Sequence, residues 1–289
     1  MLISCYYGSF SLAIAKATNS QKAIKPIDLK ANAPEQVNFA RTMREVGLFY
    51  QTKRGETVPS QFKEPYLNSD LAGIGKLCLA AVFQLPGTSR SKPSSMYLPQ
   101  YYEKIFCKDA LPQKQIATLC KELLYIDYYF RTKFLKEFDK EANNAPDANL
   151  RITLAHNART ICIAFVAFAC RYCQNNFSVS DLQIIFNASR SENAAESGVY
   201  NVFADLNSIQ YLLPPHLFAQ KNDYEAVLDK FFNVIINAGF ASFSMASNFD
   251  PAITPTNYLK KDSSYYSILK TQWSAIQAEI KRIWSSIPN

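Results

Sequence analysis

Apolar residues recur every three or four positions along most of the chain, with charged and amide residues between them. This spacing puts the apolar side chains on one face of an α-helix. The segments that show it are 33–46, 71–85, 101–106, 112–142, 150–174, 222–240 and 263–286. We therefore expect a mainly α-helical fold, a multi-helix globular array in which the almost entirely apolar segment 150–174 lies at the centre of the core.

Polar and proline-containing stretches separate these segments. Ser69 or Asp70 can cap a helix over Leu71–Leu85, because both side chains accept hydrogen bonds from the free N–H groups of a first turn. Pro86-Gly87 should end that helix. The run 143–149 combines asparagines with a proline and predicts a clear break.

Two N-terminal segments have the character of short strands. Residues 48–52 alternate in polarity, and residues 1–8 are apolar and aromatic ahead of a predicted helix. We therefore expect one small strand pair near the N-terminus. The pattern changes to long helices after about residue 106, which predicts an N-terminal segment over 1–106 and a C-terminal helical domain over 107–289.

Composition supports a folded chain and narrows its chemistry. A chain of 289 residues can bury a sizeable core, and a hydrophobic content of 48% argues against disorder. Only 8 glycines disfavour glycine-rich phosphate loops. The net charge of +7 is compatible with nucleic-acid binding, and solvated lysines explain it equally well.

Cysteine usage and hydropathy bear on the compartment. The seven cysteines are an odd number and lie mostly in apolar helical stretches, as buried, reduced thiols of a cytosolic protein do. No run of about 18 uninterrupted apolar residues occurs, so we expect no transmembrane span. The first residues lack the basic region and cleavage site of a secretory signal. These features predict a cytoplasmic protein.

A series of polar and apolar residues near the start carries a resemblance to a known family. In order, they are Ala17-Thr-Asn-Ser-Gln21, Ile24-Lys25-Pro26, Asp28-Leu29, Asn32, Gln36, Phe49-Tyr50 and Lys53-Arg54-Gly55-Glu56. This series resembles the AIPR family of bacterial abortive-infection phage-resistance proteins, strongly over residues 12–56 and more thinly to about 106. The resemblance implies a role in anti-phage defence. Because family members are longer, it also implies that this chain is a C-terminal portion, either truncated or encoded as a split gene.

Basic residues in two places suggest nucleic-acid binding. Lys53-Arg54 follow the rings of Phe49-Tyr50, and cations neutralise phosphates while rings stack on unpaired bases. The polar stretch 88–95 predicts an exposed loop whose hydroxyls and cations grip a phosphate. The alternatives are an Arg54–Glu56 pair with both rings in the core, and a loop that is merely solvated. The residues predicted to bind nucleic acid are Asn19, Gln21, Lys25, Lys53, Arg54, Arg90 and Lys92.

One constellation suggests catalysis. Arg151 and His156 have the Arg-x4-His spacing of the all-helical HEPN ribonucleases, in which the two side chains polarise a phosphate and move a ribose proton. Ile152 departs from that pattern, because the residue after the arginine is usually polar. A structural histidine is the alternative.

Two further motifs do not predict a site. Cys170-Arg-Tyr-Cys173 has no second cysteine pair, so we expect no structural metal there and no cofactor elsewhere. Glu279-Ile-Lys281 has the form of a nuclease motif, but it lies in a helical pattern and not on a strand.

The sequence thus predicts a helical module of anti-phage defence that binds nucleic acid or a partner, such as another defence subunit or a missing N-terminal part. A metal-independent ribonuclease using Arg151 and His156, and a purely structural assembly module, stay open as alternatives.

Overall fold

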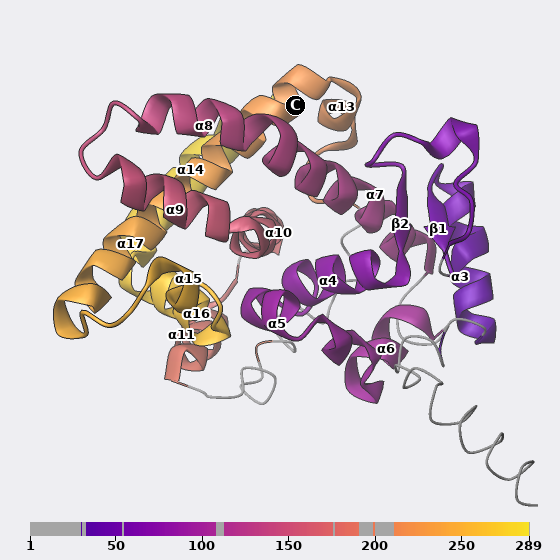
Figure 1. The fold of residues 1–289 in the computed structure, drawn as a ribbon, viewed down its shortest axis with the longest axis horizontal. Coiled ribbons are helices and arrows are strands. Elements are labelled where there is room, and N and C mark those ends of the chain that lie inside the picture. Colours follow the sequence, from indigo (N-terminus) through magenta and orange to yellow (C-terminus); the bar gives the residue numbers. More distant parts are fainter. Residues whose placement is uncertain are drawn as a thin grey trace, which may run out of the picture.

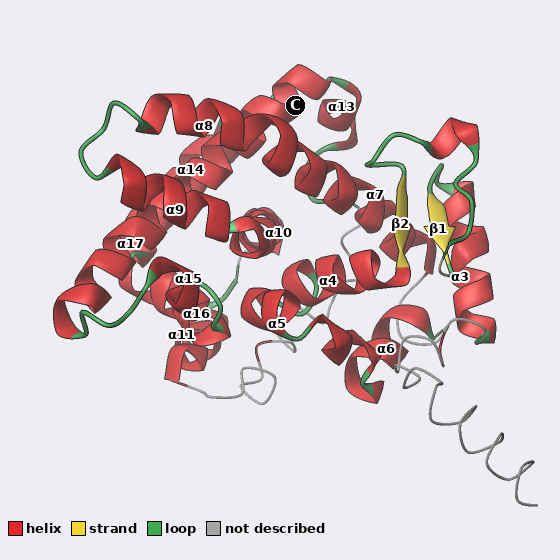
Figure 2. Cartoon of the chain, viewed as in Figure 1, coloured by secondary structure: helices red, strands yellow, loops and turns green. Residues whose placement is uncertain are grey.

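The computed structural model describes residues 33–53, 55–107, 113–175, 177–190 and 211–288, together with Lys30 and Val199. The described chain is built mainly of helices, with one small sheet at its N-terminal side (Figure 1, Figure 2). The mainly α-helical fold predicted from the apolar spacing is therefore confirmed.

Short elements predominate before residue 110 and long helices after it. The first group is α3 (Pro34–Glu45), β1 (Phe49–Gln51), η1 (Ser60–Phe62), β2 (Asn68–Asp70), α4 (Leu71–Ala81), α5 (Pro86–Ser91), η2 (Pro93–Tyr97) and α6 (Pro99–Phe106). The second group is α7 (Gln113–Tyr129), the π turn η3 (Phe130–Phe134), α8 (Leu135–Ala142), α9 (Ala148–Asn157), α10 (Arg159–Asn175), α11 (Val179–Asn187), η4 (Ala188–Arg190), α13 (Pro215–Ala219), α14 (Lys221–Phe249), α15 (Pro255–Tyr258), α16 (Asp262–Thr271) and α17 (Trp273–Ser285).

The predicted strand pair is present, with a partner that the sequence did not indicate. β1 pairs in parallel with β2, with Phe49 opposite Asn68, and Figure 2 shows both strands beside α3. β2 was missed because its sequence, Asn-Ser-Asp, has no apolar residue and is typical of a turn. The segment 1–8, predicted as a strand, lies outside the described residues.

Asp70 caps α4 as predicted, with its carboxylate accepting a hydrogen bond from the Gly73 N–H at 2.7 Å. The predicted end of this helix is wrong. α4 stops at Ala81, and the chain then turns back on the helix end, with Leu85 N–H donating to Leu79 C=O at 2.8 Å. Pro86 does not end α4 but begins α5, because proline suits the first position of a helix.

The segment 150–174 was predicted as one helix and forms two, α9 and α10, at an angle of 70°. In a continuous helix the Asn157 carbonyl would accept an N–H from four residues ahead. Here it accepts Nη1 of Arg90 at 2.8 Å, and the next helix starts anew after Ala158. A long-range contact thus sets the break.

Two C-terminal predictions also need correction. The helix predicted over 222–240 continues to residue 249 as α14, and the helix predicted over 263–286 is interrupted at Gln272 between α16 and α17. The extension of α14 is rich in serine, which weakens the apolar period. The Ser244 and Ser247 hydroxyls donate to carbonyls of their own helix and do not end it.

By length and composition alone, α14 could cross a membrane, and so could the bent pair α9–α10. Core helices pass the same test, and half of the apolar window of α14 is buried inside the protein. This is weak evidence for a span.

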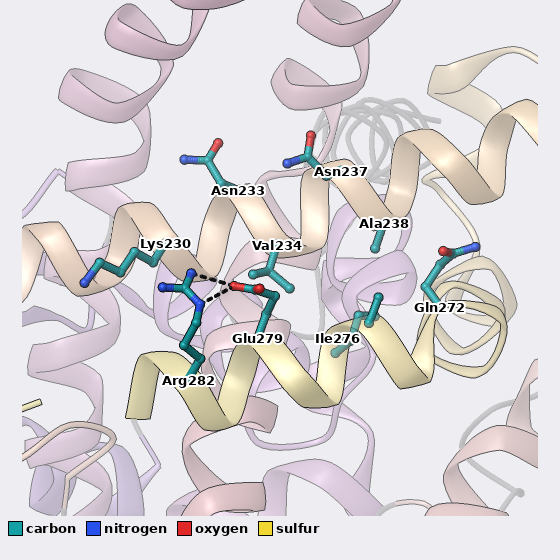
Figure 3. Close-up of a pocket in the computed structure, with 10 residues that line it drawn as sticks. Lys230, Asn233, Val234, Asn237, Ala238, Gln272, Ile276, Glu279 and Arg282 are labelled. Atoms are coloured by element: carbon teal, nitrogen blue, oxygen red, sulfur yellow. Dashed lines mark hydrogen bonds and ion pairs between the residues drawn. The ribbon is translucent and has the colours of Figure 1, made fainter. Parts of the chain in front are cut away.

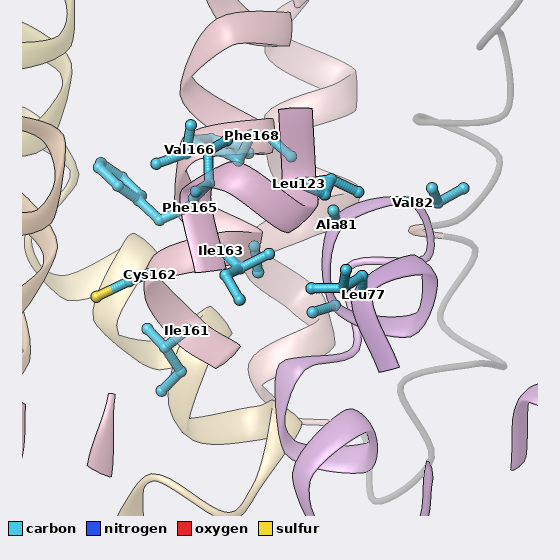
Figure 4. Packing of buried hydrophobic residues seen from close by; sticks show 14 of the residues in the cluster. Leu77, Ala81, Val82, Leu123, Ile161, Cys162, Ile163, Phe165, Val166 and Phe168 are labelled. Carbon is cyan, nitrogen blue, oxygen red and sulfur yellow. The ribbon is translucent and has the colours of Figure 1, made fainter. Parts of the chain in front are cut away.

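α10 occupies the centre of the core, as the sequence predicted. Every residue over 161–170 is buried, and Figure 1 shows α10 nearly end-on between α4 and α14. In Figure 4, Ile163 faces Leu77 of α4. One hydrophobic core therefore runs through the described residues on both sides of residue 106, and the division into parts 1–106 and 107–289 stays a prediction.

The amide of Gln84 is a polar junction inside this core. Gln84 is fully buried and has a positive φ of 57°. Its Nε2 donates to the Ala81 and Ala164 carbonyls at 3.0 Å, and its Oε1 accepts from the Tyr265 hydroxyl at 2.9 Å. The Gln84 carbonyl accepts from the Tyr266 hydroxyl. One residue thus joins α4, α10 and α16.

Replacing Gln84 with leucine should lower the free energy of unfolding by about 2–4 kcal/mol, because the Tyr265 hydroxyl and two carbonyls lose their partners in a dry site. Urea denaturation followed by circular dichroism measures the change. Gln183→Leu, at an exposed position of α11, is the matched control and should be neutral. Equal stability of the two variants would show that the amide junction is dispensable.

Glu122 on α7 is a buried carboxyl whose proton affinity depends on the fold. It is 2% exposed, and its Oε2 accepts from Leu212 N–H at 3.1 Å and the Tyr224 hydroxyl at 3.3 Å. Burial raises the pKa of Glu122 to about 8, and these hydrogen bonds offset the rise only in part.

The raised pKa of Glu122 makes stability pH-dependent. The folded protein binds this proton more tightly than the unfolded chain, so the contribution is full below about pH 4.5 and is lost as pH rises through about 8. Between these values the free energy of unfolding should fall by up to about 5 kcal/mol. Glu122→Gln should flatten this slope in urea denaturation at several pH values, whereas the exposed control Glu64→Gln should keep it. A slope unchanged by Glu122→Gln would contradict this assignment.

Candidate nucleic-acid interface

A cavity of about 200 Å³ lies where α4, α5, α9 and α10 meet. Each of the four helices contributes one basic side chain: Lys76, Arg90, His156 and Arg159. We call this site the basic cavity. The rest of its lining is Leu77, Ala80, Ser89, Asn157, Thr160 and Ile163.

Arg90 is fixed in place by the junction of α9 and α10. Its Nη1 and Nη2 donate to the carbonyl and the Oδ1 of Asn157, at 2.8 Å and 2.5 Å. Partial burial lowers the pKa of Arg90. The Ser89 hydroxyl donates to the Lys76 carbonyl at 2.8 Å and ties α5 to α4. The positive charge of Arg90 therefore has a defined position, and no carboxylate of the described residues pairs with it.

Two other basic side chains have acidic partners. Arg159 donates to both oxygens of Asp127, at 2.5 Å and 2.8 Å, and Asp127 is shared with Arg131. The Nε2 of His156 lies 3.0 Å from both oxygens of Asp139. Because Arg131 and Arg159 share the single carboxylate of Asp127, a net positive charge remains and the region is electropositive.

Lys76 and Thr160 complete the cavity. Lys76 is exposed, and its ammonium has no side-chain partner within the described ranges. Thr160 lies in the first turn of α10, where backbone N–H groups favour an anion. Its Oγ1 is buried without a hydrogen bond. The combination of a free ammonium, a guanidinium, a hydroxyl and a helix start is suited to a phosphate group.

The prediction that residues 88–95 form an exposed loop is wrong. Most of the segment is helical, in α5 and η2, and Ser89 is fully buried. The hydroxyl and N–H of Thr88 and the N–H of Gly87 donate to the carboxylate of Asp262, with the shortest contacts at 2.6 Å. The predicted donors do hold an anion, and it belongs to the protein itself.

Gly87 allows this close approach. A Cβ at this position would lie 2.4 Å from the Asp262 backbone nitrogen and 2.6 Å from the Lys260 carbonyl oxygen. Those contacts are too short for any side chain, so only glycine fits. Burial raises the pKa of Asp262, although the hydrogen bonds from Thr88 and Gly87 favour its charged form.

The predicted stacking of Phe49 and Tyr50 on bases is also wrong. Both rings are 2% exposed. The Tyr50 hydroxyl donates to Gln36 Oε1 at 2.6 Å, and Gln36 Nε2 donates to the Tyr102 hydroxyl at 2.9 Å. The rings therefore pack in the core, which was the alternative interpretation.

The remaining predicted binding residues are scattered. Arg90 alone among them lines the basic cavity. Lys53 and Lys92 are exposed and do not line the basic cavity. The residues of this set that lie outside the described ranges are Asn19, Gln21, Lys25 and Arg54.

Arg151 and His156 are not brought to one site. Arg151 lies over the ring of Phe240, 4.2 Å from its centroid, and its Nη1 donates to Asn237 Oδ1 at 3.3 Å. His156 faces Asp139 of α8. Five helical positions turn the two side chains about 140° apart, so each contacts a different helix.

The other two motifs are helical, as predicted. Cys162 and Cys170 are fully buried, and burial raises the pKa of both thiols. No disulfide forms among the described cysteines, and no group of three metal-binding side chains occurs within the described ranges. Glu279 lies on α17 and pairs with Arg282, at 2.6 Å.

A family model described as AIPR protein matches residues 2–210, more than two thirds of the chain. The chain belongs to the AIPR family. No curated protein and no solved structure matches it. AIPR membership is consistent with a role in anti-phage defence. The matched range extends well beyond residue 106 and includes the whole lining of the basic cavity.

Sequence reasoning found two of the four basic residues of the basic cavity and missed Lys76 and Arg159. Lys76 had a signal, since it is the one charged residue of the apolar helix α4. Nothing in the sequence pattern marked Arg159, because only the bend between α9 and α10 brings it into the site.

Asp262→Ala should lower the melting temperature, because buried donors on Gly87 and Thr88 lose their acceptor, at a cost of about 1–3 kcal/mol. Acetate should restore part of the loss by occupying the vacated position, whereas chloride at equal ionic strength should not. Thermal denaturation measures both effects. Asp223→Ala, at an exposed position of α14, is the control. A melting temperature insensitive to both the substitution and acetate would contradict the role of this carboxylate.

Proposed function

We propose that this AIPR-family protein acts in bacterial anti-phage defence by binding the phosphates of nucleic acid in the basic cavity. The observation that carries the proposal is the convergence of Lys76, Arg90, His156 and Arg159 from four helices. Cations at such a site neutralise phosphates and release counterions, which supplies most of the affinity for nucleic acid.

The size and position of the basic cavity favour a single strand or a strand end. A volume of about 200 Å³ holds a phosphate with part of its sugar, and a duplex would have to contact the rim. Arg90 and the free ammonium of Lys76 are the proposed phosphate ligands, and the exposed Lys92 extends the positive surface beyond the end of α5. Such contacts position a strand without reading its sequence.

Lys76→Ala combined with Lys92→Ala tests this proposal. Neither ammonium has a side-chain partner within the described ranges, so folding should be unaffected. Affinity for single-stranded RNA or DNA should fall about tenfold, and the slope of log affinity against log salt should flatten by about 1.4 for two lost phosphate contacts. Gel-shift titrations at several salt concentrations measure both quantities.

The control removes the same charge elsewhere. Lys270→Ala combined with Lys281→Ala takes two exposed lysines from α16 and α17 and should leave affinity and slope unchanged. Equal losses of affinity in the two double variants would show that binding depends only on the net charge of the protein and not on the basic cavity. Failure of the wild-type protein to bind nucleic acid would instead favour an assembly module.

RNA cleavage is a second candidate, favoured by one observation. His156 lines the same cavity, and the Asp139 carboxylate is placed to orient its ring. A histidine oriented by a carboxylate next to cations can move a ribose proton while the cations stabilise the phosphate. The proposed phosphate ligands are then Arg90 and Arg159, in place of Arg151. RNA that stays intact with the wild-type protein in the gel-shift series would exclude this candidate.

A further inference from the structure

A second site lies away from the basic cavity, in a groove of about 440 Å³ between α14 and α17. This volume is within the usual range of small-molecule sites. Three kinds of side chain line the groove. The amides are Asn233, Asn237 and Gln272, the cations are Lys230 and Arg282 beside Glu279, and the apolar residues are Val234, Ala238, Ala275 and Ile276. We call it the amide groove.

The amides present hydrogen-bonding groups that the protein does not use. Asn233 and Asn237 stand one turn apart and project from the same side of α14 (Figure 3). The Oδ1 of Asn237 accepts from Arg151, which leaves its amide N–H groups for a ligand. Asn233 and Gln272 make no side-chain hydrogen bond in the part of the chain that the structure describes. Each amide offers a donor and an acceptor side by side.

An apolar floor lies in the same groove, on the side of α14 that faces α17. Val234 and Ile276 lie between the two helices in Figure 3, and Ile276 is 1% exposed. Ala238 is 8% exposed and belongs to the same floor. A flat ring can contact this floor while its edge meets the amides.

One end of the groove is positively charged. Lys230 and Arg282 lie at the same end in Figure 3. Arg282 uses Nε and Nη2 on Glu279, at 3.0 Å and 2.6 Å, and no bond is made by its Nη1 in the described ranges. The Lys230 ammonium is exposed and has no partner there. From Gln272 to Arg282 the groove follows α17 for about 15 Å.

We propose that the amide groove binds an adenine nucleotide. The primary amide of asparagine matches the N6 and N7 edge of adenine in a bidentate pair, which assigns this edge of the base to Asn233. Asn237 contributes only its amide N–H groups, because its Oδ1 accepts from Arg151. The base lies on Val234, and the phosphate reaches the charged end at Lys230 and Arg282.

Isothermal titration calorimetry with the full chain tests this site, using adenosine monophosphate, adenosine, uridine monophosphate and inorganic phosphate as probes. Asn233→Leu should weaken adenosine monophosphate and adenosine at least tenfold. Arg282→Gln should weaken the nucleotide and leave the nucleoside unchanged. Asn248→Leu, an exposed asparagine farther along α14, is the matched control and should change neither affinity.

Four outcomes would overturn the proposal: no binding of adenosine monophosphate, equal affinity for uridine monophosphate, equal affinity for inorganic phosphate, or equal losses in Asn233→Leu and Asn248→Leu. Asn233→Asp, which keeps the side-chain volume, replaces Asn233→Leu if that variant does not fold. The double variant of Lys76 and Lys92 should retain nucleotide affinity, so failure of this site and failure of the basic cavity are distinguishable.

Discussion

Gln84 leaves α4 with a positive φ, and its amide must then find every partner inside the core. A buried amide without partners would cost several kcal/mol, so the carbonyl of Ala164 and the hydroxyl of Tyr265 have to meet it at hydrogen-bonding distance. This requirement sets α10 and α16 against the end of α4. The turn that follows Gln84 also fixes where α5 begins, and α5 carries Arg90 to the break between α9 and α10.

The Asp262 carboxylate holds α5 from the opposite side. Its bonds to Gly87 and Thr88 secure the start of the helix, while Arg90 secures its end on Asn157. A helix of six residues has little intrinsic stability, so these contacts explain why α5 forms at all. They also explain why the sequence suggested a phosphate-binding loop. Hydroxyls and N–H groups in the first turn of a helix bind a carboxylate of the same chain as well as they bind a phosphate from outside.

The sequence predicted what depends on local periodicity and failed where distant contacts decide. The helices, the capping of α4 by Asp70 and the central position of α10 follow from apolar spacing and cap chemistry. The break at Ala158 does not, because it needs Arg90 from a helix nearly seventy residues earlier. For the same reason the pattern identified Arg90 and His156 singly but could not show that they share a cavity with Lys76 and Arg159.

The proposed binding in the basic cavity would depend on the fold itself. Its wall is the first turn of α10, and the next ten residues of that helix are fully enclosed. A phosphate held between Lys76, Arg90 and Thr160 would bridge α4, α5 and α10 at the junction that Gln84 already organises. A ligand that binds only the folded form stabilises it in proportion to its own affinity. Phosphate binding here would therefore strengthen the central packing of the molecule, and the rigid core would in turn keep the cations together at little entropic cost.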